Sequence, residues 1–326
     1  MKPRLFSILL FISVFLAACA SPTAQPTLPA PAVSESQVTP TSTQPAPEFP
    51  LTITDGLQRT LTFEAPAQRI ISLAPSNTEI LFALGAGEQL VGRDVLSDFP
   101  PEAQGVADIG DTFIGLNTEL IISLEPDLVL AAEITPVEQV AQLEQLGVNV
   151  FWLANPSDFE GLYANLAIVG QLTGRSTEAA SLVAVLEERV AAVDNALLAK
   201  TNTPAVFYEL DASEPAAPWT SGAGTFIDLL IARAGGRNAA EGIQGAFAQM
   251  SIEELLVQDP DVILLGDAAY GITVESVGQR AGWGDLAAVQ SGSVYPFDDN
   301  LISRPGPRLV DALEELARLL HPDLFE

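Results

Sequence analysis

One segment of the chain occurs twice. Residues 117–130 (NTELIISLEPDLVL) align without gaps with residues 251–264 (SIEELLVQDPDVIL), so every matched pair lies 134 positions apart. Each copy begins with a residue that caps helices, continues through a short helix to a Pro-Asp turn, and ends in an apolar strand typical of a buried parallel sheet. The alternative is that two unrelated helix–strand units acquired similar capping and turn residues independently. Both copies, however, also carry a glutamate at the same place, Glu119 and Glu253, which the fold does not require. The repeat therefore predicts two similar lobes.

In the folded part of the chain, short apolar strands alternate with amphipathic helices. This alternation begins after Pro66 and predicts the α/β class with mainly parallel sheets. An Asp-Gly pair at 55–56, between two alternating segments, predicts that a β-hairpin precedes the first sheet. We expect strands at 69–73, 90–92, 128–131, 148–153, 205–208 and 262–265, and helices at 77–84, 137–146, 226–234 and 252–257.

A long helix is predicted between the two lobes. Residues 177–200 contain no glycine or proline and carry apolar residues at helical spacing. A helix of this length spans about 36 Å, enough to connect two lobes. We therefore place an N-terminal lobe at 51–173, an interlobe helix at 174–201 and a C-terminal lobe at 202–326. Because one helix resists bending, we expect the angle between the lobes to change little when a ligand binds.

The first residues are typical of a lipoprotein signal peptide, which we place at 1–19. Lys2 and Arg4 precede an apolar run that is too short for a comfortable membrane span and ends in Leu-Ala-Ala-Cys. This ending matches the bacterial lipobox, in which Cys19 is lipidated; the alternative is a buried structural cysteine. Cys19 is the only cysteine, which excludes disulfides and thiolate metal sites. Residues 20–50, rich in Pro, Thr and Ser, predict a disordered tether, so we expect an extracytoplasmic protein anchored to the membrane by lipid.

The charge and the single histidine exclude several classes of function. With 42 acidic against 14 basic residues, the net charge of -28 repels phosphate backbones, so no nucleic-acid partner is expected. His321 is the only histidine, which excludes a Ser-His-Asp triad and a histidine-ligated metal site. No complete dinucleotide or ATP-binding fingerprint occurs. An enzyme that places two carboxylates such as Asp98 and Asp111 across a cleft is the alternative; we predict no enzyme, no protein-bound metal and no resident cofactor.

Several short motifs follow one another in a characteristic order over residues 50–326. They are RIISLAPSNTE at 69–79, SDFPP at 97–101, NTE at 117–119, PDLV at 126–129 and RPGPR at 304–308. Together with the long helix and the lipobox, this order resembles the helix-linked periplasmic binding proteins for cobalamin, ferric siderophores and haem. The resemblance implies a small-molecule metal chelate bound in a cleft between the lobes, and delivery to an ABC permease and its ATPase subunit. We expect a monomer whose ligand, not the protein, carries any cobalt or iron.

Two motifs resemble the cobalamin-binding branch of this family most closely. They are SDFPP at 97–101 and WTSG at 219–222. The sequence departs from that branch at Leu96 and Phe113, where the resemblance implies Tyr and Trp beside the corrin. We expect a corrinoid ligand, with a ferric siderophore as the alternative and haem as the third candidate.

Loops at the carboxyl ends of parallel strands are the expected ligand site in both lobes. Strand position alone selects Pro75, Ser76 and Asn77 in one lobe and residues 267–270, which include Tyr270, in the other. The resemblance adds Leu96, Phe113, Trp219, Asn300 and Arg304. Aromatic side chains suit a large flat ligand, and Arg304 would clamp an anionic group with its planar fork. The alternatives are core packing for Phe113 and Trp219 and a surface position for Arg304.

The paired acids of the repeat have two interpretations. Glu119 and Glu253 each occupy the second position of a predicted helix, where the helix dipole favours a carboxylate. The resemblance implies instead that one exposed glutamate on each lobe docks with arginines of the permease. We prefer docking, because the repeat places the two acids in equivalent positions.

Overall fold

The computed structural model describes residues 48–325. The predicted signal peptide, Cys19 and nearly all of the tether therefore lie outside the described residues. A hairpin of β1 (Leu51–Thr54) and β2 (Thr60–Phe63) comes first, as the Asp-Gly turn predicts. In the described range, no helix is both long enough and apolar enough to cross a membrane.

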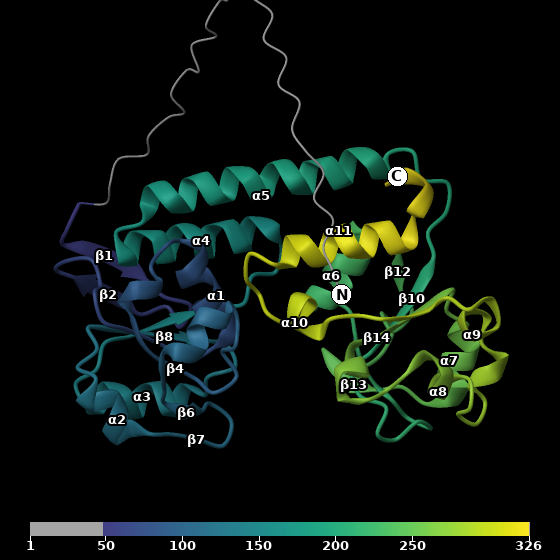
Figure 1. Cartoon of the computed structure of the whole chain (residues 1–326), viewed down its shortest axis with the longest axis horizontal. Helices are drawn as coiled ribbons and strands as arrows, with labels where there is room; N and C mark the ends of the chain where they lie inside the picture. The colour runs from purple at the N-terminus through teal and green to yellow at the C-terminus, as the bar shows by residue number, and fades with distance from the viewer. Residues whose placement is uncertain (1–47, 326) are drawn as a thin grey trace, which may run out of the picture. The chain divides into compact units, whose positions relative to one another are not determined.

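The N-terminal lobe contains a parallel five-stranded sheet in the order β5-β4-β3-β8-β9 (Figure 1). Its strands alternate side chains between two apolar layers. Leu128 and Leu130 face the layer that includes α1, whereas Val129 faces the layer that includes α2 and α3. The elements are β3 (Ile70–Ser72), α1 (Pro75–Ala83), β4 (Leu90–Arg93), β5 (Ala107–Asp108), α2 (Thr118–Ser123), β8 (Leu128–Ala132), α3 (Val137–Gln145) and β9 (Val150–Leu153).

The C-terminal lobe contains a parallel four-stranded sheet in the order β12-β10-β14-β15. Each lobe also carries a short antiparallel ribbon, β6 with β7 and β11 with β13. These ribbons are not among the expected elements. The N-terminal ribbon is β6 (Gly110–Asp111) and β7 (Gly115–Leu116); the C-terminal lobe comprises β10 (Ala205–Glu209), β11 (Trp219–Ser221), α6 (Phe226–Arg233), β12 (Arg237–Asn238), β13 (Phe247–Gln249), α7 (Ile252–Gln258), β14 (Val262–Leu265), α8 (Val274–Val277), α9 (Ala287–Ser291), β15 (Val294–Pro296), α10 (Asp299–Ile302) and α11 (Leu309–Leu320).

The repeat corresponds to the same structure in both lobes. Asn117 and Ser251 cap α2 and α7, and each side chain accepts the backbone N–H three residues later, at 3.0 and 3.2 Å. Asp127 and Asp261 of the Pro-Asp turns accept backbone N–H groups at the neighbouring strand, at 2.7 to 3.0 Å. The turn thus fixes how β8 and β14 enter their sheets, and the prediction of two similar α/β lobes is confirmed.

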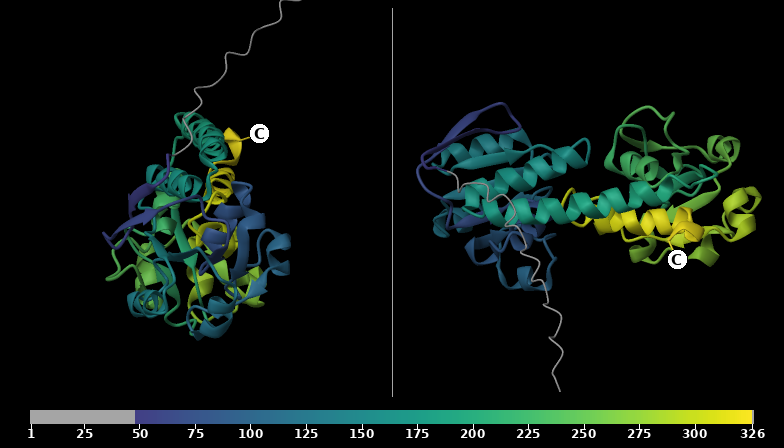
Figure 2. Two further views of the ribbon diagram at one scale, coloured as in Figure 1. Left: turned by 90° about the vertical axis from the view of Figure 1, so that its left-hand side faces the viewer. Right: turned by 90° about the horizontal axis from the view of Figure 1, so that it is seen from above.

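The long helix α5 (Ser176–Leu197) connects the two lobes. It packs against α4 (Phe159–Thr173) on the N-terminal side and against α11 on the C-terminal side (Figures 1 and 2). Arg189 fastens it to α11 by bonds to Asp311 and Glu314 at 2.6 and 2.9 Å.

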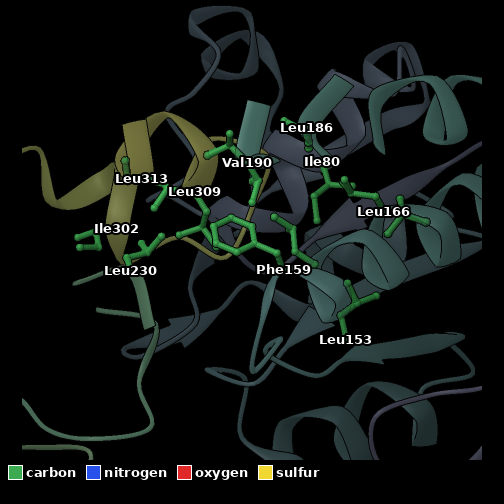
Figure 3. Close-up of a cluster of buried hydrophobic side chains, with 14 of the residues drawn as sticks. Ile80, Leu153, Phe159, Leu166, Leu186, Val190, Leu230, Ile302, Leu309 and Leu313 are labelled. Carbon is green, nitrogen blue, oxygen red and sulfur yellow. The ribbon is translucent and has the colours of Figure 1, made fainter. Parts of the chain in front are cut away.

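One buried apolar cluster continues from the N-terminal lobe through α4 and α5 into the C-terminal lobe. Figure 3 shows Phe159 of α4 with Leu166 on one side, Leu230 and Leu309 on the other, and Val190 of α5 above it. Since packed interiors have few voids, bending at this junction would disrupt buried contacts in both lobes. The shared core therefore supports the expectation of a small change in lobe angle.

Candidate functional site

The first candidate loop follows β3. Pro75 begins α1 and is half-buried, while Ser76 and Asn77 are buried, and the Asn77 amide donates to the Leu130 carbonyl at 3.1 Å. Of the three predicted residues in this loop, Pro75 offers the largest accessible surface. Because Ser76 and Asn77 are buried, Pro75 is the main surface that this loop offers to a ligand.

The loop after β4 holds Leu96 toward solvent. Asp94 is buried and accepts the Ser97 hydroxyl and the Leu96 backbone N–H, the latter at 3.2 Å. Burial raises the pKa of Asp94, and the bonds from Ser97 and Leu96 oppose that rise. The Thr78 hydroxyl lies 2.9 Å from the Ser97 hydroxyl and ties the loop to α1. Leu96 is exposed on this rigid turn.

The ribbon β6–β7 presents two apolar side chains at its tip. Asp111 accepts the backbone N–H groups of Phe113 and Ile114 at 2.7 and 3.1 Å, which closes the turn. The Thr112 hydroxyl donates to the Leu73 carbonyl at 2.8 Å and anchors the ribbon beside the end of β3. Phe113 is 68% exposed, so the alternative of core packing does not describe it, and Ile114 is exposed beside it although no motif selects it.

Aromatic side chains are also exposed in the C-terminal lobe. The register of β11 and β13 places Trp219 and Phe247 on one face of their ribbon, and both are exposed. Tyr270 ends the 3-10 turn Gly266–Tyr270 after β14 and is 87% exposed. Phe247 is absent from the sequence-based site. Asn300 lies on α10 after β15 and is half-buried.

Arg304 has protein carboxylates as partners. Its Nη1 bonds to Asp98 at 2.6 Å and to the buried Glu79 at 3.3 Å. Arg308 forms a fork with Glu79 at 2.8 and 2.6 Å and stacks over the Phe99 ring at 3.9 Å. These bonds join the RPGPR motif to α1 and to the SDFPP motif. The predicted role of Arg304 as a ligand clamp stays a prediction, and it requires exchange of these bonds.

Across residues 48–325, every arginine is bonded to or paired with a protein acceptor. Arg93 is buried and donates to the backbone carbonyls of Ala103, Asp94 and Val95, so its guanidinium is already bonded within the protein. The single described lysine, Lys200, donates to Thr203 and Gly235. The others are Arg59, Arg69, Arg175, Arg189, Arg233, Arg237, Arg280, Arg304, Arg308 and Arg318.

Two further predicted features concern metals and docking. Within the part of the chain that the structure describes, no group of three or more His, Cys, Asp or Glu side chains is arranged to hold a metal ion. Glu119 and Glu253 are the second residues of α2 and α7, and both are exposed. Their positions in the two lobes are equivalent.

Comparison with known proteins places these features in a family. The family model of periplasmic binding proteins matches residues 70–301. The chain is 31% identical, over the full length of both proteins, to YvrC of Bacillus subtilis, named an uncharacterized ABC transporter substrate-binding lipoprotein. It is 29% identical to a cobalamin-binding protein of Halobacterium salinarum, over 84% of this chain and 74% of that one.

Solved structures are similar over most of the chain. The apo haem-binding protein RhuT of Roseiflexus superposes with a TM-score of 0.71 at 31% identity, covering 79% of this chain and 99% of that one. An Fe3+-hydroxamate transport protein of Saccharomonospora viridis superposes with a TM-score of 0.67 at 26% identity, covering 84% and 99%. These proteins are named for different ligands, so the likeness defines the fold and the mode of action more closely than the cargo.

Proposed function

We propose that this chain, which belongs to the periplasmic binding protein family, captures a corrinoid outside the cytoplasm and delivers it to an ABC permease. Its relatives are substrate-binding components of transporters. The alternative within the same fold is a ferric siderophore or haem.

The observation that carries the corrinoid proposal is the chemistry of the exposed side chains around the strand ends. The N-terminal lobe exposes Leu96, Phe113 and Ile114, and the C-terminal lobe exposes two aromatic side chains, Trp219 and Tyr270. Rigid aromatic side chains bury a large area at little entropic cost, which suits a broad and largely apolar ring. A corrinoid with little net charge requires no cationic partner.

The paired state of the arginines weighs against a ferric siderophore. An anionic chelate is held best by the planar fork of arginine, and each described arginine already has a protein acceptor. Binding such a chelate at Arg304 would first break its bonds to Asp98 and Glu79.

Haem is the second candidate because of Tyr270. Haem iron is held by an axial side chain such as His or Tyr. His321 is buried against Gly235 and follows α11, so it is not exposed at the strand ends. Tyr270 is exposed there and could supply the phenolate oxygen.

Docking and anchoring complete the proposal. Glu119 and Glu253 would each meet a basic patch of the permease, and equivalent acids on two lobes would orient the protein on a two-fold partner. Lipid on Cys19 would hold the receptor, as a monomer, at the membrane surface where the permease lies.

A thermal-shift and absorbance screen tests the cargo. The purified fragment beginning at Glu48 is melted with cyanocobalamin, several ferric siderophores or haemin. A ligand at 100 times its Kd stabilises the native state by about 2.7 kcal/mol, which is readily observed. A shift with cyanocobalamin and a red complex is the expected result. A shift with a ferric chelate or haemin alone would refute the corrinoid and retain the transport role.

A further inference from the structure

The bond between Arg304 and Asp98 joins the two lobes beside the predicted ligand site. Asp98 follows β4 in the N-terminal lobe, and Arg304 follows β15 and α10 in the C-terminal lobe. Both residues therefore lie beyond the carboxyl ends of parallel strands, where ligands of α/β sheets bind. The Arg304 Nη1 atom lies 2.6 Å from Asp98 Oδ1, and its Nη2 atom lies 3.4 Å from the carbonyl oxygen of Leu96, an exposed residue of the predicted site.

Two carboxylates bond to Arg304, and they differ in burial. The Glu79 side chain is 2% exposed and already accepts both arms of the Arg308 fork, so its contact with Arg304 is longer, at 3.3 Å. The Asp98 side chain is 54% exposed, against 13% for Arg304 itself. Glu79 is thus the inner partner of Arg304 and Asp98 the outer one. Another anion could replace the outer partner while Glu79 and Arg308 stay paired, so no charge would be left buried alone.

A third carboxylate, Asp94, lies near Arg304 but is not exchangeable. Burial raises the pKa of Asp94, and the charge of Arg304 is among the influences that oppose the rise. The Asp94 carboxylate is held within the loop, where it accepts the Ser97 hydroxyl and the Leu96 backbone N–H. Of the three carboxylates around Arg304, only Asp98 is exposed and able to turn away.

We infer that Asp98 determines the charge preference of the ligand site, because it occupies the place on Arg304 that an anionic group of a ligand would need. An arginine fork is a strong partner for carboxylates, but an incoming carboxylate would have to displace Asp98 and would be repelled by it. A neutral ligand leaves the pair intact. The inference rests on the proposed function for the position of the ligand beside Leu96 and Arg304, whereas the masking of Arg304 is testable by itself.

A small anion tests the masking without reference to the whole ligand. The purified protein is titrated with acetate, or with neutral acetamide, at constant ionic strength while the NMR signal of the Arg304 Nε–H group is followed. Asp98→Asn keeps the shape of the side chain but not its charge, and should respond to about one tenth of the acetate concentration that the wild type needs. Acetamide should shift the signal in neither protein.

The matched control is Glu102→Gln, which removes another exposed carboxylate from the same segment. This variant should respond to acetate as the wild type does, because it changes the net charge equally but leaves Asp98 on Arg304. Equal acetate responses in the wild type and Asp98→Asn would overturn the inference. The same gain in Glu102→Gln would also overturn it, because the effect would then come from net charge alone.

Whole ligands that differ by one charge then test the preference itself. Cyanocobalamin is compared with its monocarboxylate derivatives, in each of which one peripheral amide is hydrolysed. For at least one derivative, the ratio of its Kd to that of cyanocobalamin should fall about tenfold in Asp98→Asn and stay unchanged in Glu102→Gln. Adding Arg304→Gln to Asp98→Asn should restore the wild-type ratio, because the gain requires the unmasked guanidinium.

The outcomes separate this inference from the proposed function. Unchanged ratios in Asp98→Asn for every derivative, with cyanocobalamin still bound, would refute Asp98 as the determinant and leave the corrinoid proposal intact. If the wild type binds no cyanocobalamin, the proposed cargo is refuted, and the acetate titration alone decides whether Asp98 masks Arg304.

Discussion

Replacing Glu79 with glutamine should destabilise the protein by about 3 kcal/mol. Glu79 lies on α1, is 3% exposed, and accepts three charged hydrogen bonds from Arg304 and Arg308. Those arginines are 225 and 229 positions away along the chain. One buried carboxylate therefore neutralises two guanidinium groups that belong to the segment between α10 and α11.

The magnitude follows from the charges that the substitution leaves behind. Removing one partner of a buried ion pair costs about 3–5 kcal/mol, because the other charge is then buried without compensation. Glutamine keeps one acceptor oxygen, and Arg304 keeps Asp98 at 2.6 Å, so the lower end of that range applies. With an unfolding entropy of about 2.1 cal/mol/K per residue over the folded part of the chain, such a loss lowers the melting temperature by about 5 °C.

Urea unfolding of the two proteins measures the effect, and Asp98→Asn is the matched control. The Asp98 side chain is 54% exposed, so losing its bond to Arg304 should cost no more than about 1 kcal/mol. Equal losses of stability for Glu79→Gln and Asp98→Asn would refute the reasoning that burial makes Glu79 the stronger partner.

Three further predictions concern the ligand, the permease and pH. Phe113→Ala and Trp219→Ala should each weaken cyanocobalamin binding about tenfold in calorimetric titrations. Because both side chains are exposed, neither substitution should lower the melting temperature. Wild-type affinity in both variants would argue against the proposed site. Glu119→Arg and Glu253→Arg should leave the ligand Kd unchanged and reduce cellular uptake, and uptake at the wild-type rate would exclude docking through these acids. Burial raises the pKa of Glu209 from its ordinary value of 4.5 to about 7, so the folded state retains a proton that the unfolded state has lost. Stability should therefore fall as the pH rises from 4.5 to about 7, and Glu209→Gln should remove this fall in urea titrations; the same pH dependence in both proteins would contradict it.

The features that could be predicted from the sequence depend on residues close together in the chain. The repeat is an example: Asn117 caps α2 through an N–H three residues away, and Ser251 does the same for α7. Apolar runs such as those of β8 and β14 indicate parallel strands because both faces of the sheet are covered. The α/β class and the long interlobe helix follow from such local patterns.

The environment of Arg304 depends on partners far away in the chain. Its bonds to Glu79 and Asp98 span more than 200 positions, and no local pattern predicts them. Arg93 shows the same limit, because its burial comes from a turn that folds back over it. Sequence reasoning therefore does not reveal which arginines are already bonded to protein acceptors.

Some features that the sequence analysis did not predict are nevertheless indicated by nearby residues in the sequence. The helix α4 is not among the expected elements, although Asp158 caps its start and Gly174 ends it with a φ of 72°. Ile114 lies between Asp111 and Gly115, turn residues whose position favours an exposed tip. No nearby residue indicates that Phe247 belongs to a ribbon, since its strand partner is about 26 residues away.

Equilibrium dialysis of the purified protein against cyanocobalamin decides whether the apolar loops bind a corrinoid. We expect one saturable site per chain with a Kd of about 1 µM or lower. The proposed cargo would be contradicted if cyanocobalamin showed no saturation up to about 100 µM while a ferric siderophore or haemin bound saturably under the same conditions.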